Sequence, residues 1–438
     1  GTPPIKIPPR RVPYSVRQAI NKQINELLEM DIIEDSNSPY SFPIVPIKKK
    51  TGEVRIAIDY RELNKVSKKE AVPLPRPDDI LASLGDVNAK VFSKMDLKMG
   101  YHQVIMADDS KEKTAFSTHH GHFQYKRMPL GIAVAPQIFS RLMQKVIKGL
   151  DLDHIFVYLD DILVATEMVE KHKEVLDQLF RRLQEAGLRL KPSKCDYFRK
   201  EIIFLGHNLS EEGIRADPAL LDKIQNFPVL LTVKNIRSFL GLCQYFRCHI
   251  KSFSLIAKPL YELTSAYTTP FNELPPKAMA AFEKLKELMV SPPVLAYPNF
   301  KKPFYIETDS SKHGLGAVLL QKDENGKVHP IAFASRRLNE HESHYGITTL
   351  EGLAVTWALK HFRFYVLGRE IYVITDHSAL AGLLKNPKCD RLIVAPGNAG
   401  TAEIAWNATL DIEDGEPLPI VKNVYLGGPV GPNLCMVI

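Results

Sequence analysis

Two adjacent aspartates, Asp160 and Asp161, lie between two short apolar runs and constrain the fold of this chain more than any other feature. The run Ile155 to Ala165 is rich in β-branched and aromatic residues, which predicts two strands joined by a tight turn. Neighbouring carboxylates repel each other and are costly to desolvate, so a pair held between buried strands needs a counter-charge, usually a divalent cation. A polar hairpin tip is the simpler alternative, because short motifs often arise by chance.

A third carboxylate favours the cation. Asp96 ends another strand-like run, Lys90 to Asp96. Two oxygen-ligated metal ions about 4 Å apart need carboxylates from at least two strands. Asp96, Asp160 and Asp161 are therefore candidates for one site. The order of a strand ending in aspartate, a helix and then an Asp-Asp hairpin resembles the palm of a reverse transcriptase.

Longer motifs connect these residues to a known family. Tyr158-Leu159-Asp160-Asp161 matches the Tyr-x-Asp-Asp box of reverse transcriptases. Phe92 to Gln103 and Met128 to Gly131 resemble the polymerase of gypsy-type LTR retrotransposons, and the resemblance runs from about Pro13 to Lys388. It implies an α+β multidomain fold, with a right-hand polymerase (fingers, palm, thumb) followed by a truncated RNase H-like α/β domain.

The resemblance also implies an RNA-directed DNA polymerase that uses two Mg²⁺ ions. Asp96, Asp160 and Asp161 would be the catalytic and metal-binding carboxylates. We expect Asp161 to be the weaker direct ligand, because consecutive side chains in a strand diverge. The expected partners are an RNA template, a DNA primer, the RNA–DNA hybrid and deoxynucleoside triphosphates.

Motif order divides the chain into five parts. We expect an N-terminal lead-in and first helix, then fingers and palm, a thumb and connection, an incomplete RNase H-like domain and an unrelated tail. Their limits are 1–35, 36–210, 211–298, 299–390 and 391–438. In the first part, Ser15 to Gln18 has the form of a capping box that would begin the first helix.

Composition sets weaker bounds. The 438 residues carry a net charge of +7, which favours a polyanionic partner but discriminates poorly alone. No apolar run approaches the roughly 20 residues of a membrane span, so we expect no membrane association. The five cysteines form neither a Cys-x-x-Cys pair nor an even framework, which predicts an intracellular chain, cytoplasmic or nuclear. Gly1 in place of methionine is typical of a fragment. The oligomeric state stays open.

Phosphate binding is predicted near a basic hairpin. Lys48 to Gly52 forms its tip, and Asp59 to Asn64 matches the Asp-Tyr-Arg-x-Leu-Asn motif of the family's fingers. The resemblance implies that Lys49, or its neighbour Lys50, and Arg55 hold the triphosphate of the incoming nucleotide. A merely solvated charged turn is the alternative, because surface lysines usually have no other role.

Two further residues are expected to contact the nucleotide. The resemblance places Tyr101 under the sugar, where it would exclude a 2′-hydroxyl. A core tyrosine with a satisfied hydroxyl group is the competing interpretation. Leu130 lies in the segment expected to pack on the templating base pair, where the family usually has phenylalanine. Leucine is apolar and of similar reach, so we expect weaker stacking and an unchanged fold.

The run Phe204, Leu205, Gly206 and His207 resembles the family's primer grip. A glycine within a strand allows close backbone approach, here by the 3′ end of the primer.

A second set of carboxylates lies further along. Asp309, Glu351 and Asp376 follow an alternating strand and helix pattern that is typical of a two-metal nuclease, and their motifs match the RNase H domain of the family. They would bind two further Mg²⁺ ions if the domain is active. The family's fourth aspartate, in an Ala-Asp-Ala-Leu-Ser-like segment, is missing, which predicts impaired RNase H activity.

From about Arg391 the resemblance ends. Residues 392–402 weakly resemble glycinamide ribonucleotide synthetase, which is typical of a chimeric junction or a gene-model join. Two alternatives to a working polymerase remain. The chain could be a non-catalytic nucleic-acid-binding relic of a retroelement, or a product too incomplete to fold stably, because its last domain would leave a sheet partly uncovered.

Overall fold

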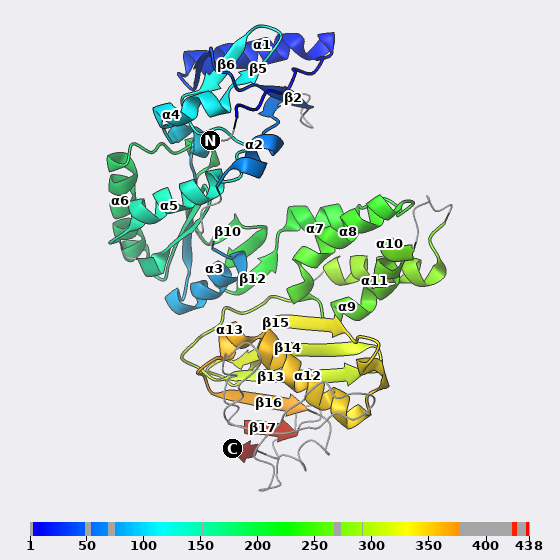
Figure 1. The fold of residues 1–438 in the computed structure, drawn as a ribbon. Coiled ribbons are helices and arrows are strands. Elements are labelled where there is room, and N and C mark those ends of the chain that lie inside the picture. Colours follow the sequence, from blue (N-terminus) through cyan, green and yellow to red (C-terminus); the bar gives the residue numbers. More distant parts are fainter. Residues whose placement is uncertain are drawn as a thin grey trace. The chain divides into compact units, whose positions relative to one another are not determined.

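The computed structural model (Figure 1) describes residues 3–48, 54–68, 75–150, 152–266, 273–290, 292–375, 423–426 and 435–437. The chain forms two compact units. The first unit consists of residues 1–80 and 89–200, and the second of residues 81–88 and 201–438. Among the described residues, no helix is both long and apolar enough to cross a lipid bilayer.

A four-stranded antiparallel sheet, here called the central sheet, lies in the first unit. Its strand order is β7-β8-β4-β9. The strands are β4 (Val91–Asp96), β7 (Ile155–Tyr158), β8 (Asp161–Thr166) and β9 (Asp196–Arg199). Five consecutive residues of β8, from Ile162 to Thr166, are buried, as expected for a strand with neighbours on both sides. The predicted hairpin on either side of the two aspartates is present as β7 and β8.

Two amphipathic helices pack on the central sheet. They are α5 (Ala135–Ile147), which carries a proline in its first turn, and α6 (Val169–Glu185). Proline fits there because the first helical N–H groups have no partner within the helix. One core joins the two helices to the sheet, and its fully or nearly fully buried side chains include Met95, Phe139, Met143, Ile162, Val164, Val175 and Leu179.

The remaining sheet of the first unit has the strand order β1-β6-β5-β2-β3. Its strands are β1 (Ile33–Asp35), β2 (Phe42–Lys48), β3 (Val54–Ile58), β5 (Phe116–Ser117) and β6 (His122–Tyr125). It shares a core with α1 (Tyr14–Glu29). The capping box predicted at Ser15 is wrong: Pro13 is the N-cap residue, without a side-chain cap bond, and Ser15 lies inside the helix. The N-cap thus lies two residues earlier than predicted, at a proline whose fixed φ suits the start of a helix.

Short helices connect the strands and longer helices of both units. They are α2 (Arg61–Val66), α3 (Pro77–Ser83), α4 (Asp108–Lys111) and the 3₁₀ turns η1 (Leu84–Val87), η2 (Gly100–Gln103), η3 (Glu112–Thr114), η4 (Leu152–His154), η5 (Pro192–Lys194), η6 (Arg247–His249) and η7 (Glu342–His344). Of these, η2 has a direct bearing on the site, because it begins four residues after β4 ends.

The second unit begins with a three-stranded meander and a group of helices. The strands are β10 (Glu201–Phe204), β11 (His207–Ser210) and β12 (Gly213–Ala216). The helices are α7 (Pro218–Gln225), α8 (Val233–Tyr245), α9 (Phe253–Ile256), α10 (Lys258–Ala266) and α11 (Pro276–Val290). Their apolar faces enclose a single core, in which the Phe239 and Phe282 rings lie 4.7 Å apart.

A six-stranded sheet with the order β15-β14-β13-β16-β17-β18 completes the second unit. Its strands are β13 (Phe304–Ser311), β14 (Gly314–Lys322), β15 (Val328–Arg337), β16 (Ile371–Thr375), β17 (Asn423–Leu426) and β18 (Cys435–Val437), with the helices α12 (Ile347–His361) and α13 (Arg363–Val366). Helix α12 packs across this sheet (Figure 1). Strand β16 pairs in parallel with both β13 and β17, so the last part of the chain adds two strands to the sheet.

Candidate functional site

The three aspartates predicted from sequence gather at one end of the central sheet. Asp96 is the last residue of β4 and Asp161 the first of β8, and the two are register partners. Asp160 lies in the two-residue turn between β7 and β8, where Leu159 has a left-handed φ of 55°. A Cβ atom on Gly100 would lie only 3.2 Å from the Asp160 Cβ, so the turn packs closely against the start of η2.

Positive charge borders these carboxylates. The Lys194 Nζ lies 2.9 Å from Asp96 Oδ2, and the Lys94 Nζ lies 3.9 Å from Asp161 Oδ1. Burial raises the pKa of Asp161, and the charges of Asp160 and Asp96 raise it further, against the opposing effect of Lys94. The Asp161 carboxyl group is therefore close enough to Asp96 and Asp160 for their charges to disfavour its ionised form.

The donor set suits a hard cation. Carboxylate oxygens are the ligands that Mg²⁺ prefers, and a cation among these three side chains would offset the repulsion that raises the pKa of Asp161. Across the part of the chain that the structure describes, no three His, Cys, Asp or Glu side chains are already gathered tightly enough to hold a metal ion. The aspartates converge on one edge without being preassembled as ligands.

Tyr101 lies in η2 beside this edge. Its ring is half-buried and packs on the fully buried Phe139, with 5.4 Å between ring centroids. Burial raises the pKa of Tyr101, and the Asp160 charge raises it further. One side of the ring thus belongs to the core, while the residue also interacts electrostatically with a catalytic candidate.

Arg55 approaches the same region from β3. Its side chain is exposed, and its charge contributes to the lowered pKa of His102, for which burial is the larger cause. His102 follows Tyr101 in η2 and stacks on Tyr125, with Nδ1 3.1 Å from the Met128 carbonyl oxygen. The predicted partners Lys49 and Lys50 lie outside the described residues, and so does Asp376.

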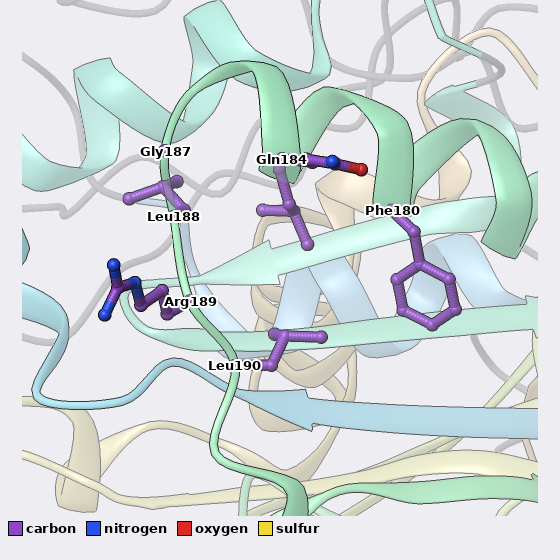
Figure 2. A pocket seen from close by; sticks show the side chains of 7 residues that line it. Phe180, Gln184, Gly187, Leu188, Arg189 and Leu190 are labelled. Carbon is purple, nitrogen blue, oxygen red and sulfur yellow. The ribbon is translucent and has the colours of Figure 1, made fainter.

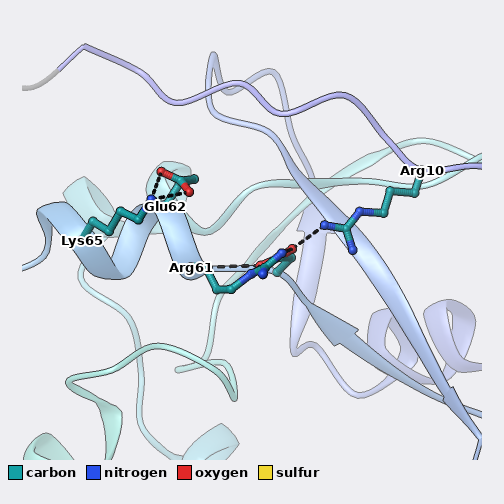
Figure 3. A network of polar contacts seen from close by, with 5 residues as sticks. Arg10, Arg61, Glu62 and Lys65 are labelled. Atoms are coloured by element: carbon teal, nitrogen blue, oxygen red, sulfur yellow. Dashed lines mark hydrogen bonds and ion pairs between the residues drawn. The ribbon is translucent and has the colours of Figure 1, made fainter. Parts of the chain in front are cut away.

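A polar network fixes the Asp59 to Asn64 motif. Arg61 binds the Asp59 carboxylate through two nitrogens, at 2.8 and 2.7 Å, and Arg10 approaches the same carboxylate from the N-terminal segment (Figure 3). These hydrogen bonds hold the pKa of Asp59 far below its usual range. From the same motif, Asn64 Nδ2 donates to the Gly131 carbonyl oxygen and Asn64 Oδ1 accepts from the Ala133 N–H.

Asn64 thereby holds the loop that presents Leu130. The Leu130 side chain is 39% exposed, although its neighbour Met128 is buried. Gly131 adopts a φ of 96°, which a side chain would strain. The hydrogen bond from Asn64 therefore holds the loop at Gly131, directly after the exposed Leu130 side chain.

The predicted primer-grip residues form the turn between β10 and β11 in the second unit. Phe204 and His207 are buried register partners, so their side chains belong to the core. Leu205 and Gly206 form the turn itself, with φ values of 47° and 68°. The turn is half-buried, and its two carbonyl oxygens accept hydrogen bonds from the Tyr245 hydroxyl and the Asp217 N–H.

Comparison with known proteins identifies this architecture. Residues 47–209 match the family described as reverse transcriptase (RNA-dependent DNA polymerase), and residues 274–373 match the RNase H-like domain found in reverse transcriptase. The chain belongs to the reverse transcriptase family. Members of the family use divalent metal ions, generally Mg²⁺.

Three curated relatives of the chain are retrotransposon polyproteins. The Pol polyprotein from transposon 297 of Drosophila melanogaster is 40% identical over 375 residues, which cover 84% of this chain and 35% of the relative. The polyprotein from transposon gypsy of the same organism is 34% identical, over 83% and 36%. The Tf2-3 polyprotein of Schizosaccharomyces pombe is 31% identical, over 86% and 28%. The chain thus spans about a third of the length of these relatives.

Solved structures show the same fold. A foamy viral protease–reverse transcriptase in complex with double-stranded DNA superposes with a TM-score of 0.79 at 26% identity, covering 88% of this chain and 67% of that one. The foamy viral protein in complex with an RNA/DNA hybrid gives a TM-score of 0.76 at 26% identity, over 88% and 52%. The predicted fold, a polymerase domain followed by an RNase H-like domain, is confirmed.

In the RNase H-like domain, two of the three predicted carboxylates are described. Asp309 is exposed on β13, whereas Glu351 is 5% exposed in α12. The Ser310 hydroxyl donates to Glu351 Oε1 at 2.5 Å, which links the helix to the residue after Asp309. The two carboxylates therefore lie on directly connected elements.

Several residues that the sequence did not single out contact the predicted site residues. Lys194 pairs with Asp96, His102 lies near Arg55, Asn64 holds the Leu130 loop, and Gln103 makes three hydrogen bonds close to Asp96. The contacts of Lys194 with Asp96, of Asn64 with Gly131 and of Gln103 with Arg189 each join residues more than 60 positions apart in the sequence. The bond from Gln103 to Lys98 is local. Asn64, His102 and Gln103 lie in the matched motifs Asp59 to Asn64 and Phe92 to Gln103, and this was the sequence signal that could have found them.

A cavity of about 360 Å³ lies beside the central sheet. Figure 2 shows Phe180 and Gln184 of α6 on one side of it and Leu190, from the segment that follows α6, on the other. The backbone of that same segment is hydrogen-bonded to the end of β4, because the Lys191 N–H donates to the Asp96 carbonyl oxygen at 2.9 Å.

Proposed function

We propose that this chain is an RNA-directed DNA polymerase of a retrotransposon. The observation that carries the proposal is the register pairing of Asp96 with Asp161, with Asp160 in the adjacent turn, inside a domain that matches reverse transcriptases. Nucleotidyl transfer needs carboxylates from two strands to hold two metal ions, and this edge supplies them.

Asp96, Asp160 and Asp161 would hold two Mg²⁺ ions. Bound there, the metal ions would supply Lewis acidity toward the primer 3′-hydroxyl and the triphosphate. The protein residues orient the reactants: Asp96 and Asp160 provide the more direct oxygens, and Asp161 balances the charge. Lys194 and Lys94 limit the net negative charge of the site in the folded protein.

For nucleotide binding, we propose Arg55 and Lys49 as phosphate contacts. A guanidinium group offers a forked donor to phosphate oxygens, and a lysine offers a point charge. Tyr101 lies beside Asp160, where its ring would exclude a 2′-hydroxyl, and the exposed Leu130 would pack on the templating base pair. The loop contact from Asn64 supports this role of Leu130.

The proposed partners are an RNA template, a DNA primer, their hybrid and deoxynucleoside triphosphates. The two foamy viral structures hold double-stranded DNA and an RNA/DNA hybrid, and the present chain superposes on both. The Leu205-Gly206 turn is the proposed contact for the primer end, because its two residues are only half-buried, whereas Phe204 and His207 are buried.

We also propose that the RNase H-like domain is impaired. Asp309 and Glu351 would hold divalent metal ions together with Asp376, but no fourth aspartate follows in the expected sequence context. We propose in addition that the five parts of the chain have the limits predicted from the sequence.

The test is deoxynucleotide incorporation on a primed RNA template with Mg²⁺. The wild-type chain should extend the primer, and Asp160→Asn should reduce extension at least ~10³-fold while still binding the hybrid, because transition-state charge stabilisation is lost. A folded wild-type protein that binds the hybrid without extending the primer would identify a non-catalytic relic instead. Cleavage of the hybrid's RNA strand, assayed in parallel, tests the RNase H proposal.

A further inference from the structure

Gln103 makes an unusual set of contacts at the end of η2. Its Nε2 group donates to the Lys98 carbonyl oxygen at 2.7 Å and to the Arg189 carbonyl oxygen at 3.0 Å. Its Oε1 atom accepts from the Arg189 N–H at 2.6 Å. A primary amide has two N–H donors, and both are used. The side chain therefore pairs with the Arg189 peptide much as a neighbouring strand would.

These bonds extend a short ladder that begins at Asp96. The Lys191 N–H donates to the Asp96 carbonyl oxygen, and the Lys98 N–H donates to the Arg189 carbonyl oxygen, both at 2.9 Å. Leu97 and Leu190 are the bridge partners between them. Backbone pairing ends at Lys98, and the Gln103 amide adds the next contacts after the chain has turned through η2.

The turn closed by Gln103 contains the residues that need exact placement. It runs from Asp96 to Tyr101, and it includes Met99 with a left-handed φ of 51° and Gly100 packed against Asp160. A non-glycine residue in that conformation is strained, and it persists only where its surroundings hold it. Gln103 binds both Lys98, within the turn, and Arg189, in the opposite segment.

We propose that Gln103 is a positioning residue of the polymerase site. Its amide fixes the turn between Asp96 and Tyr101 against residues 189–191, and so sets the distance from the carboxylate edge to the aromatic ring that discriminates between sugars. The inference rests on the proposed polymerase function, and it adds a residue that touches neither the metal ions nor the nucleotide.

Two variants and one matched control test this inference. Gln103→Ala removes all three hydrogen bonds, whereas Gln103→Glu keeps the size and the acceptor but turns an oxygen toward two carbonyl groups. Gln184→Ala, at an exposed glutamine of neighbouring α6, is the control. The first readout is amide hydrogen exchange in peptides covering residues 96–103 and 186–193. We expect exchange at least ~10-fold faster in both Gln103 variants and unchanged exchange in the control, because an opened hydrogen bond exposes its amide.

The second readout is kinetic. Both Gln103 variants should lose about 100-fold in kcat/KM for deoxynucleotides, since misplacement of about 1 Å can cost that much. Discrimination against ribonucleotides should fall ~10-fold, because Tyr101 no longer holds its position. An equal loss for both nucleotide types, with discrimination intact, would overturn the inference, as would wild-type exchange rates in Gln103→Ala. If the wild-type chain extends no primer, the polymerase proposal fails, and with it the catalytic part of this inference, while the exchange data still decide whether Gln103 holds the turn.

Discussion

Asp96 and Asp161 face each other as register partners of β4 and β8, and each has a lysine beside it, Lys194 at 2.9 Å and Lys94 at 3.9 Å. Burial and the neighbouring carboxylates raise the pKa of Asp161 above its usual range. The edge of the central sheet therefore keeps like charges together at a cost in stability, as is common where residues are arranged for metal binding.

This cost predicts a stabilised but inactive variant. Because the folded pKa of Asp161 is raised above its ordinary value of 3.8, the folded state binds a proton more readily than the unfolded state. Stability therefore falls as pH rises through this interval, and the destabilisation is fully present at neutral pH. In EDTA at pH 7.5, Asp161→Asn should melt about 2 °C higher than the wild type by calorimetry, and it should lose primer extension. Asp153→Asn, at an exposed aspartate of η4, should change neither property.

Two substitutions separate the two interpretations of Tyr101. If its ring blocks a 2′-hydroxyl, Tyr101→Phe should retain discrimination against ribonucleotides and Tyr101→Ala should lose it by at least ~10-fold, because only alanine removes the ring. Single-nucleotide incorporation with matched deoxy and ribo substrates measures both ratios. Unchanged discrimination in Tyr101→Ala would leave the tyrosine as a core residue packed on Phe139.

The loop that presents Leu130 depends on Asn64. Asn64→Ala removes the bonds to Gly131 and Ala133, at 2.9 and 2.8 Å, and should lower the free energy of unfolding by about 1–2 kcal/mol. It should also raise the KM for deoxynucleotides, because the loop loses its anchor. Denaturant titration and steady-state kinetics measure the two effects. Asn64→Asp keeps only the acceptor to Ala133, so an effect equal to that of alanine would contradict a role for that bond.

Acid should destabilise the second unit. His207 is buried, and burial together with His249 lowers its pKa from 6.5 to about 4. Between pH 6.5 and about 4, His207 is therefore protonated in the unfolded chain and neutral in the folded chain. The free energy of unfolding is therefore highest above pH 6.5 and falls as the pH decreases toward 4. The melting temperature should drop by several degrees between pH 7 and pH 5. The exposed His341→Gln should leave this profile unchanged, whereas a pH-independent melt would show that His207 is not buried in neutral form.

The hairpin around Asp160 and Asp161 could be predicted from sequence because its information is local. Runs of alternating or continuous apolar residues indicate strands. The resemblance to reverse transcriptases then predicted the order of the domains. The helix at Tyr14–Glu29 was also predicted, but its first turn was misplaced, because Pro13 sets the backbone where the pattern favoured Ser15.

Tertiary structure decided which distant groups meet. The pairing of Lys194 with Asp96 spans 98 positions, and the bonds from Gln103 to Arg189 span 86. Neither contact can be predicted from periodicity, because the sequence pattern does not show whether a lysine or a glutamine side chain is solvated or hydrogen-bonded to another residue. Similarly, the sequence placed Phe204 and His207 at a primer contact, whereas packing buries both side chains and leaves Leu205 and Gly206 half-buried. The sequence by itself thus determined the chemistry of the carboxylates and the strands that carry them. Only the folded chain decided their spacing, their counter-charges and the contacts that hold them, because these depend on which segments pack together.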